Sequence, residues 1–273
     1  MNESSNANSQ RGRPCRETGL PRTSPLLLSW FRWYGRRYLA RHFHTLRISR
    51  SGAAPPDAGP LIVFLNHASW WDPLVCLALG QRFFPERESY AAMDAEALEK
   101  YRFFRRLGFF PVRRGPHAGR DFLRVAPRVL EQPGAILWLT PQARFADARE
   151  RPVQLKPGVG ILMKQMPSVA AVPLAIEYSF WEERKPEALV RFGKAIHASS
   201  APGLSSAGWT AALSSALERT QTALASEVIS RRPEDFQCVL RKSSGVTPLF
   251  DAWTRLRFFL SGMKPLAAIH GTK

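Results

Sequence analysis

The stretch LIVFLNHASWWDP, residues 61–73, decides the fold that the sequence predicts. Its first five residues form an unbroken apolar run, which is typical of a strand buried on both faces. His67 follows this run almost at once, and Asp72 comes five positions later, in front of a proline. Histidine titrates near neutral pH, and a carboxylate on its far ring nitrogen fixes the tautomer. A tight turn that returns Asp72 to His67 would therefore create a general base, although a His and an Asp at this spacing also occur by chance.

Apolar runs and helical patterns alternate along the rest of the chain. Strands are expected at 61–65, 89–93, 108–114, 135–139, 169–176 and 189–192. Helices are expected at 73–80, at 94–107 with Asp94 as N-cap, at 117–131, from Pro157 onward, and at 208–230. The alternation predicts an α/β fold, a single domain with a mostly parallel mixed sheet flanked by helices. Pro173 is expected at a sheet edge or a bulge.

The two ends of the chain differ in composition from this domain. Residues 1–24 are rich in Ser, Asn, Arg and Pro and are expected to be a disordered tail. Residues 25–50 are expected to form an amphipathic helix with Trp30 and Tyr34 on one face and arginines on the other. Such a helix suits the membrane interface, or else packs its aromatic stripe on the core. Residues 55–232 then hold the α/β domain, and 233–273 a C-terminal extension with a second amphipathic helix.

Composition narrows the class of partner. The 273 residues carry a formal net charge of +17, which implies an anionic partner such as a nucleic acid, an acidic lipid surface or a polyanionic substrate. The three cysteines show no metal-binding spacing, and their odd number argues against a disulfide framework, so no metal is expected and the compartment is expected to be reducing. No apolar run approaches the roughly 18 residues of a membrane span, and no signal peptide is expected.

Four blocks of the sequence resemble the glycerolipid or lysophospholipid acyltransferases, the PlsC-like family. The first block is Asn-His-x-x-x-x-Asp, matched by Asn66, His67 and Asp72. The second is a glycine-led strand that ends in arginine, matched from Gly108 to Arg114. Order and spacing agree from about residue 55 to residue 197, so that the segment 55–232 is expected to be an acyltransferase domain.

The third block departs from the family pattern. The family has Phe-Pro-Glu-Gly-Thr-Arg, and this chain has TPQARF at 140–145, so that Pro141 is retained while Gln142 replaces the glutamate and Ala143 the glycine. A downstream Lys-Pro-Gly at 156–158 resembles the family's Phe-Lys-x-Gly step, and a Val-Pro strand at 172–176 matches the fourth block. The residues expected to shape these motifs are Asn66, Lys156, Gly158 and Pro173.

The resemblance implies an O-acyltransferase of phospholipid biosynthesis. It makes His67 the general base and Asp72 its orienting carboxylate, with no covalent nucleophile and no cofactor beyond an acyl-CoA or acyl-carrier-protein co-substrate. The expected acceptor is a lysophospholipid such as 1-acylglycerol-3-phosphate. The residues expected to bind substrate are Gly108, Arg113, Arg114, Pro141, Gln142 and Arg144. Because Gln142 has no charge, another membrane alcohol, such as a glycosylated isoprenoid or carotenoid, stays open as the acceptor.

Two further classes remain as alternatives. One is a non-catalytic lipid-binding relative, suggested by the altered third block. The other is a nucleic-acid-binding protein, suggested by the charge, but the sequence has no zinc spacing or RNP-like signature, so no nucleic acid is expected. The basic N-terminal segment fits an anionic membrane better, and the expected location is peripheral, on the cytoplasmic face of a membrane.

Overall fold

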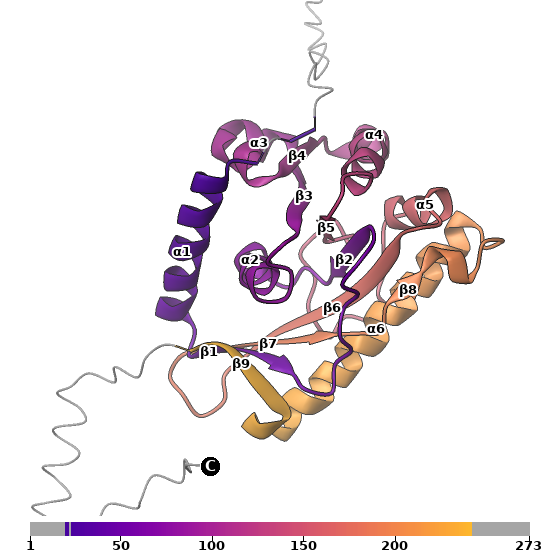
Figure 1. Ribbon diagram of the computed structural model, residues 1–273. Helices are drawn as coiled ribbons and strands as arrows, with labels where there is room; N and C mark the ends of the chain where they lie inside the picture. The colour runs from indigo at the N-terminus through magenta and orange to yellow at the C-terminus, as the bar shows by residue number, and fades with distance from the viewer. Residues whose placement is uncertain (1–19, 22, 242–273) are drawn as a thin grey trace, which may run out of the picture.

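A nine-stranded mixed sheet runs through the middle of the chain in the computed structural model, which describes residues 20–21 and 23–241 (Figure 1). Its strand order is β4-β3-β5-β2-β6-β7-β1-β9, and β8 pairs with β6. The strands are β1 (Thr45–Ser49), β2 (Leu61–Leu65), β3 (Glu88–Asp94), β4 (Phe109–Val112), β5 (Ala135–Leu139), β6 (Ala170–Ser179), β7 (Glu187–Phe192), β8 (Ile196–His197) and β9 (Phe236–Arg241).

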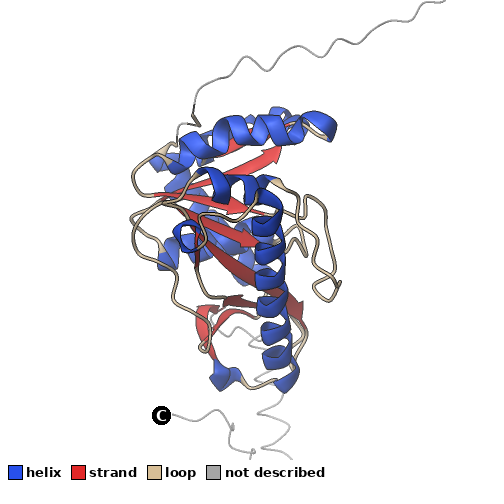
Figure 2. Cartoon of the chain, turned by 90° about the vertical axis from the view of Figure 1, so that its right-hand side faces the viewer, coloured by secondary structure: helices blue, strands red, loops and turns tan. Residues whose placement is uncertain are grey.

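Helices cover both faces of this sheet. They are α1 (Pro25–His42), α2 (Asp72–Phe83), α3 (Ala95–Lys100), α4 (Ala118–Leu130), α5 (Gly158–Gln165) and α6 (Ser206–Ser230). One core joins α1 and α2 to one face of the sheet, and a second joins α4, α5 and the first half of α6 to the other face. Figure 2 shows α6 running lengthwise across the twisted strands. The predicted α/β class with a mostly parallel mixed sheet is confirmed.

The parallel part of the sheet brings five strand ends to one edge. Strands β4, β3, β5, β2 and β6 are neighbours in this order and all run parallel. The carboxyl ends of parallel strands form the usual site of α/β proteins. The segments that follow β2, β4 and β5 begin with Asn66, Arg113 and Thr140, so the first three sequence blocks reach the same edge.

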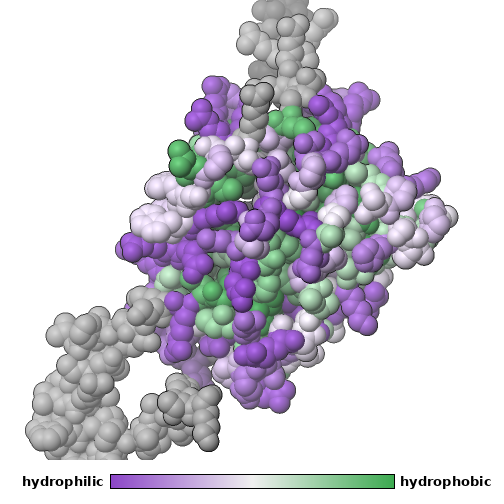
Figure 3. Space-filling view, viewed as in Figure 1, coloured by the Kyte–Doolittle hydropathy of each residue, from purple (hydrophilic) through white to green (hydrophobic). Residues whose placement is uncertain are grey.

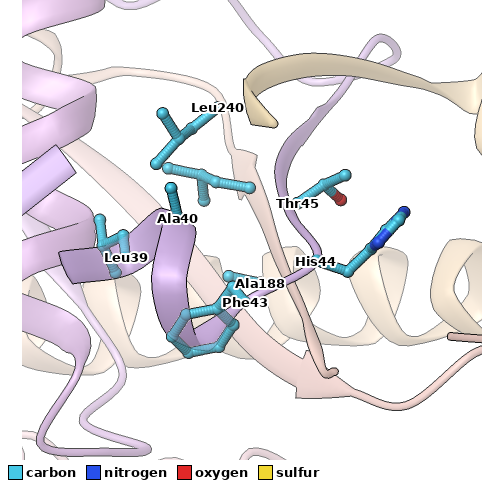
Figure 4. Close-up of a pocket in the computed structure, with 8 residues that line it drawn as sticks. Leu39, Ala40, Phe43, His44, Thr45, Ala188 and Leu240 are labelled. Carbon is cyan, nitrogen blue, oxygen red and sulfur yellow. The ribbon is translucent and has the colours of Figure 1, made fainter. Parts of the chain in front are cut away.

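The N-terminal helix is shorter than predicted. The helix expected over 25–50 ends at His42, and residues 45–49 form β1 instead, parallel to β7 and antiparallel to β9. A partner edge on each side satisfies the backbone of this β-branched segment better than another helical turn would. Figure 4 shows the junction, where Leu39 and Phe43 lie beside Ala188 of β7 and Leu240 of β9 around a shallow pocket that contains none of the predicted site residues.

Three further predictions differ from the structure. The sheet extends beyond 55–232, because β1 and β9 belong to it. The helix expected over 94–107 is capped by Asp94 but breaks at Tyr101, and Arg102–Leu107 continue as a 3₁₀ helix that packs Phe104 against Phe31 of α1. Pro173 lies in the central strand β6 rather than at an edge. On the side away from β2, β6 pairs with β7 from Leu174 onward and with β8 at Ala170 and Ala171, and the Pro173 carbonyl accepts from the Gly193 amide between them. Because Pro173 lies in this gap between the two pairings, its lack of an N–H costs the sheet no ladder hydrogen bond.

Most of the predicted disordered tail (1–24) and the predicted C-terminal amphipathic helix lie outside the described residues.

Candidate active site

His67 and Asp72 form a hydrogen-bonded pair at the carboxyl end of β2. The His67 Nδ1 lies 2.7 Å from the Asp72 Oδ2. A turn at residues 69–72 closes this contact, with the Asp72 amide donating to the Ser69 carbonyl, and α2 begins at Asp72. The imidazole remains 21% exposed while the carboxylate is 1% exposed, so the ring has one nitrogen on the buried carboxylate and presents its other edge outward.

Both oxygens of Asp72 are held by other groups as well. Oδ2 accepts from the Ser69 backbone amide at 3.1 Å, and Oδ1 accepts from the Tyr178 hydroxyl at 2.6 Å. A buried carboxylate needs such donors because it loses the solvation of water. Burial, together with the negative charge and hydrogen bond of Asp72, holds the Tyr178 pKa well above its usual range, so that hydroxyl stays a donor.

Asn66 extends the β2–β6 ladder with its side chain. Its Nδ2 donates to the Ile176 carbonyl and its Oδ1 accepts from the Ile176 amide, both at 2.9 Å. The residue is 1% exposed. Asn66 was predicted to be a structural residue of the motif. In the structure its side chain fixes the end of β6 against the end of β2.

Gln142 supports His67 through the main chain. Its Oε1 accepts from the His67 backbone amide at 3.0 Å, and its side chain is buried. Four residues later, the Ala146 amide donates to the His67 carbonyl at 2.9 Å, and the Phe145 ring lies 4.2 Å from the imidazole, centroid to centroid. The loop after β5 therefore holds the backbone of His67 on both sides and covers part of its ring.

The two second-block arginines have carboxylate partners. Arg113 forms a forked ion pair with Asp121 of α4, at 2.6 Å and 2.8 Å, and its guanidinium lowers the pKa of that carboxyl. Arg114 donates to Asp94 at 2.8 Å, and its side chain is 81% exposed. Strand β4 lies three strand spacings from β2, or about 14 Å, so Arg114 shares the edge with His67 but is not in contact with it.

The remaining predicted residues build the frame of the site. Arg144 pairs with Glu150 in the exposed loop. The Lys156 amide donates to the Pro141 carbonyl at 2.8 Å, which closes that loop at its base. Gly158 opens α5 where a Cβ would lie 3.0 Å from the Phe122 ring. Within the described residues, no three His, Cys, Asp or Glu side chains are grouped as metal ligands.

Sequence reasoning missed Tyr178. It lies 106 residues after Asp72 and belongs to no motif block, so only the pairing of β6 with β2 brings it to the site. Its one sequence signal is its place two residues beyond the fourth-block strand, near the carboxyl end of a central strand.

The fold and the site define an α/β enzyme with a His–Asp pair at the carboxyl edge of its sheet. A model of the acyltransferase family matches residues 35–177, slightly more than half of the chain. The chain belongs to this family and is an acyltransferase. No curated protein matches it. Among solved structures it is similar to the 1-acyl-sn-glycerophosphate acyltransferase PlsC from Thermotoga maritima, with a TM-score of 0.52 and 16% identity over 75% of this chain and 80% of that one. At this identity the likeness concerns the fold.

Proposed function

We propose that the enzyme transfers a fatty acyl group from a thioester, either acyl-CoA or acyl-carrier protein, to a hydroxyl of a lysophospholipid such as 1-acylglycerol-3-phosphate. The observation that carries this proposal is the 2.7 Å contact between His67 and a fully buried Asp72, with the opposite side of the imidazole left accessible. A neutral imidazole fixed in this way has the tautomer of a general base.

In the proposed reaction the outer ring nitrogen of His67 takes the proton of the acceptor hydroxyl. The oxygen attacks the thioester carbonyl, the tetrahedral intermediate collapses, and the C–S bond breaks. The proton then passes from the imidazolium to the leaving thiolate, which leaves an ester and a free thiol. Cys76 takes no part, because it is buried, and burial followed by the charge of Asp72 raises its thiol pKa.

Arginines support a phosphorylated acceptor. Arg114 is the more exposed of the two second-block arginines, and a guanidinium suits phosphate oxygens. Its separation of about 14 Å from the His67 strand leaves room for a glycerol backbone and its headgroup between them. The neutral Gln142, whose carbonyl oxygen is occupied by the His67 amide, supports the second candidate, an acceptor that is another membrane alcohol.

The described surface supports a peripheral position on an anionic membrane. Exposed aromatic residues of α1 include Trp30 and Trp33, and Trp70 projects from the loop between His67 and Asp72 with 63% exposure. Helix α1 contains no acidic residue and carries exposed arginines, and Arg37 lies 4.7 Å over the Trp33 ring. Aromatic and basic side chains together favour the interface of an anionic bilayer.

Green, pale and purple side chains lie close together along the left edge of Figure 3, where α1 lies. In the described part of the chain, no helix is long and apolar enough to cross a membrane.

The test replaces the base. His67→Ala should lower acyl transfer to a lysolipid by about 10²- to 10⁴-fold, because that is the usual contribution of general-base catalysis. His197→Ala, an exposed histidine of β8, is the matched control and should keep the wild-type rate. Equal rates for His67→Ala and the wild type, in protein with an unchanged circular dichroism spectrum, would refute the assignment.

A further inference from the structure

Tyr178 is the one side chain of β6 that reaches the catalytic carboxylate. Its hydroxyl donates to the Asp72 Oδ1 at 2.6 Å, while Oδ2 faces His67 at 2.7 Å. The three side chains thus lie in series, imidazole to carboxylate to phenol. The carboxylate is 1% exposed, so water does not substitute for the phenol.

The motif itself sets the position of this tyrosine. Asn66 holds both the amide and the carbonyl of Ile176, two residues before Tyr178 along the same strand. Side chains two apart on a strand point to the same face of the sheet. Fixing the backbone of Ile176 therefore also fixes the position along β6 from which the Tyr178 side chain projects. On its other side the Tyr178 ring packs on Phe43 at 5.5 Å, and Phe43 in turn packs on Trp71.

We propose that Tyr178 is a positioning residue for the acyl transfer: its hydroxyl fixes the Asp72 carboxylate so that Oδ2 points at the His67 ring, and it sets how strongly that carboxylate holds the imidazole proton. This inference rests on the proposed role of His67. A donor on Oδ1 withdraws electron density from the carboxylate and fixes its rotamer. Without that donor the carboxylate would hold the imidazolium more firmly and in a less defined geometry.

The titratable groups around this series come from each element that packs on it. Asp72 meets His67 from the end of β2 and Tyr178 from β6, and Cys76 of α2 lies close enough to act on both Asp72 and Tyr178. From α1, the His42 ring packs on Trp71 at 5.0 Å. The loop after β5, which packs on the imidazole through Phe145, carries the ion pair between Arg144 and Glu150. The change in the variant below is confined to the phenol, so each of these groups is kept.

The experiment compares Tyr178→Phe with Tyr90→Phe in the full chain. Tyr90 is the matched control, because its hydroxyl also donates to a carboxylate, that of Glu88, away from the site. We expect Tyr178→Phe to lower kcat by roughly ten- to a hundredfold, the range for losing a hydrogen bond to a charged group, with the KM values for donor and acceptor within twofold. The acid limb of its pH–rate profile should move upward by roughly half a unit or more. Tyr90→Phe should leave both kcat and the profile unchanged.

Two results would overturn the inference: wild-type kcat in Tyr178→Phe, or a loss of kcat with an unmoved acid limb, which a purely structural role would give. Neither result would contradict the proposed function as long as His67→Ala is inactive. Failure of the inference about Tyr178 can therefore be distinguished from failure of the proposed function. If Tyr178→Phe does not fold, 3-fluorotyrosine at position 178 provides the second test. Its more acidic phenol is a stronger donor, so the acid limb should move downward, and an unmoved limb would refute the inference.

Discussion

Gln142 holds the main chain of His67, the proposed general base. It occupies the position at which the third block of the acyltransferase family has a glutamate. Its side-chain oxygen accepts from the His67 amide, as a carboxylate oxygen would. The replacement therefore keeps the acceptor atom that the backbone needs and exchanges the second oxygen for an amide nitrogen, a donor without charge. Among the described residues, nothing accepts from that nitrogen. The change thus replaces a negative charge by a neutral donor while preserving the support of His67.

Substitutions at two positions with positive φ are expected to change the stability of the protein in opposite directions. Ala143 stands where the family has glycine and adopts φ 55°, whereas Gly108 adopts φ 93° with its missing Cβ 2.3 Å from the Ser89 carbonyl oxygen. Ala143→Gly should stabilise the protein by about 1 kcal/mol, because it relieves left-handed strain. Gly108→Ala should destabilise it by about 2 kcal/mol or more, because strain and a backbone clash add.

Urea unfolding measures both changes. Gly115→Ala is the control for Gly108, since Gly115 has φ 79° but open space where its Cβ would be, and it should cost less. A Gly108→Ala midpoint equal to that of Gly115→Ala would contradict the steric explanation.

At the scale of single residues, the sequence predicted the partners that are near each other in the chain. The spacing of His67 and Asp72 allowed a contact if the chain turned tightly between them, and one turn does close it. Tyr178 and the Gln142–His67 bond depend on strands that pair across long separations, and no local pattern encodes them. Arg113 was predicted to bind substrate, and its forked pair with Asp121 also fastens α4 to the end of β4, a contact the sequence did not indicate.

At the scale of elements, α1 connects the proposed membrane surface to the active site. Its last turn places Tyr38 and His42 against Trp71, the residue before Asp72, with centroid distances of 5.4 Å and 5.0 Å. Its outer face carries exposed Trp30 and Trp33. The aromatic residues of α1 are therefore divided, since one part packs on the core and another part faces outward.

The outer part can be tested separately. Trp30→Ala combined with Trp33→Ala should weaken binding to vesicles containing phosphatidylglycerol by about tenfold or more, because two large side chains lose their interfacial burial. Added salt should weaken wild-type binding further. Ile229→Ala, which removes an exposed hydrophobic residue of α6, is the control and should bind like the wild type in sedimentation with vesicles. Unaltered binding by the double variant would exclude α1 as the docking surface.

Elements in the middle of the chain were easier to predict than those at its ends. Strands such as β2 and β5 are unbroken apolar runs, and their lengths matched the prediction. The segments 45–49 and 236–241 carry mixed polar and apolar residues. They become strands because β1 pairs with β7 on one side and with β9 on the other. A pairing between the two ends of a domain depends on tertiary structure, so a local pattern could not predict it.

At the scale of the whole molecule, the fold places the proposed acyl-transfer site and a basic, aromatic helix on one chain. The alternation of strands and helices predicted the layered α/β class. His67 and Gln142 lie together at the carboxyl edge of the parallel strands, where the sites of such sheets usually form. The strand order was not predictable, and it is the order that leaves Arg114 three strands away from His67. The resulting edge is wide, which suits an acceptor with a headgroup at some distance from its reacting hydroxyl.

His67 is proposed to direct the transfer of an acyl group from a thioester to a lipid hydroxyl. The most direct measurement incubates the purified protein with ¹⁴C-labelled acyl-CoA and a total lipid extract, and identifies the labelled product by chromatography and mass spectrometry. On the proposed role of His67, we expect one labelled lipid ester that forms with the wild type and is absent with His67→Ala. Labelled ester formed equally by both proteins, or label found only as free fatty acid, would contradict it.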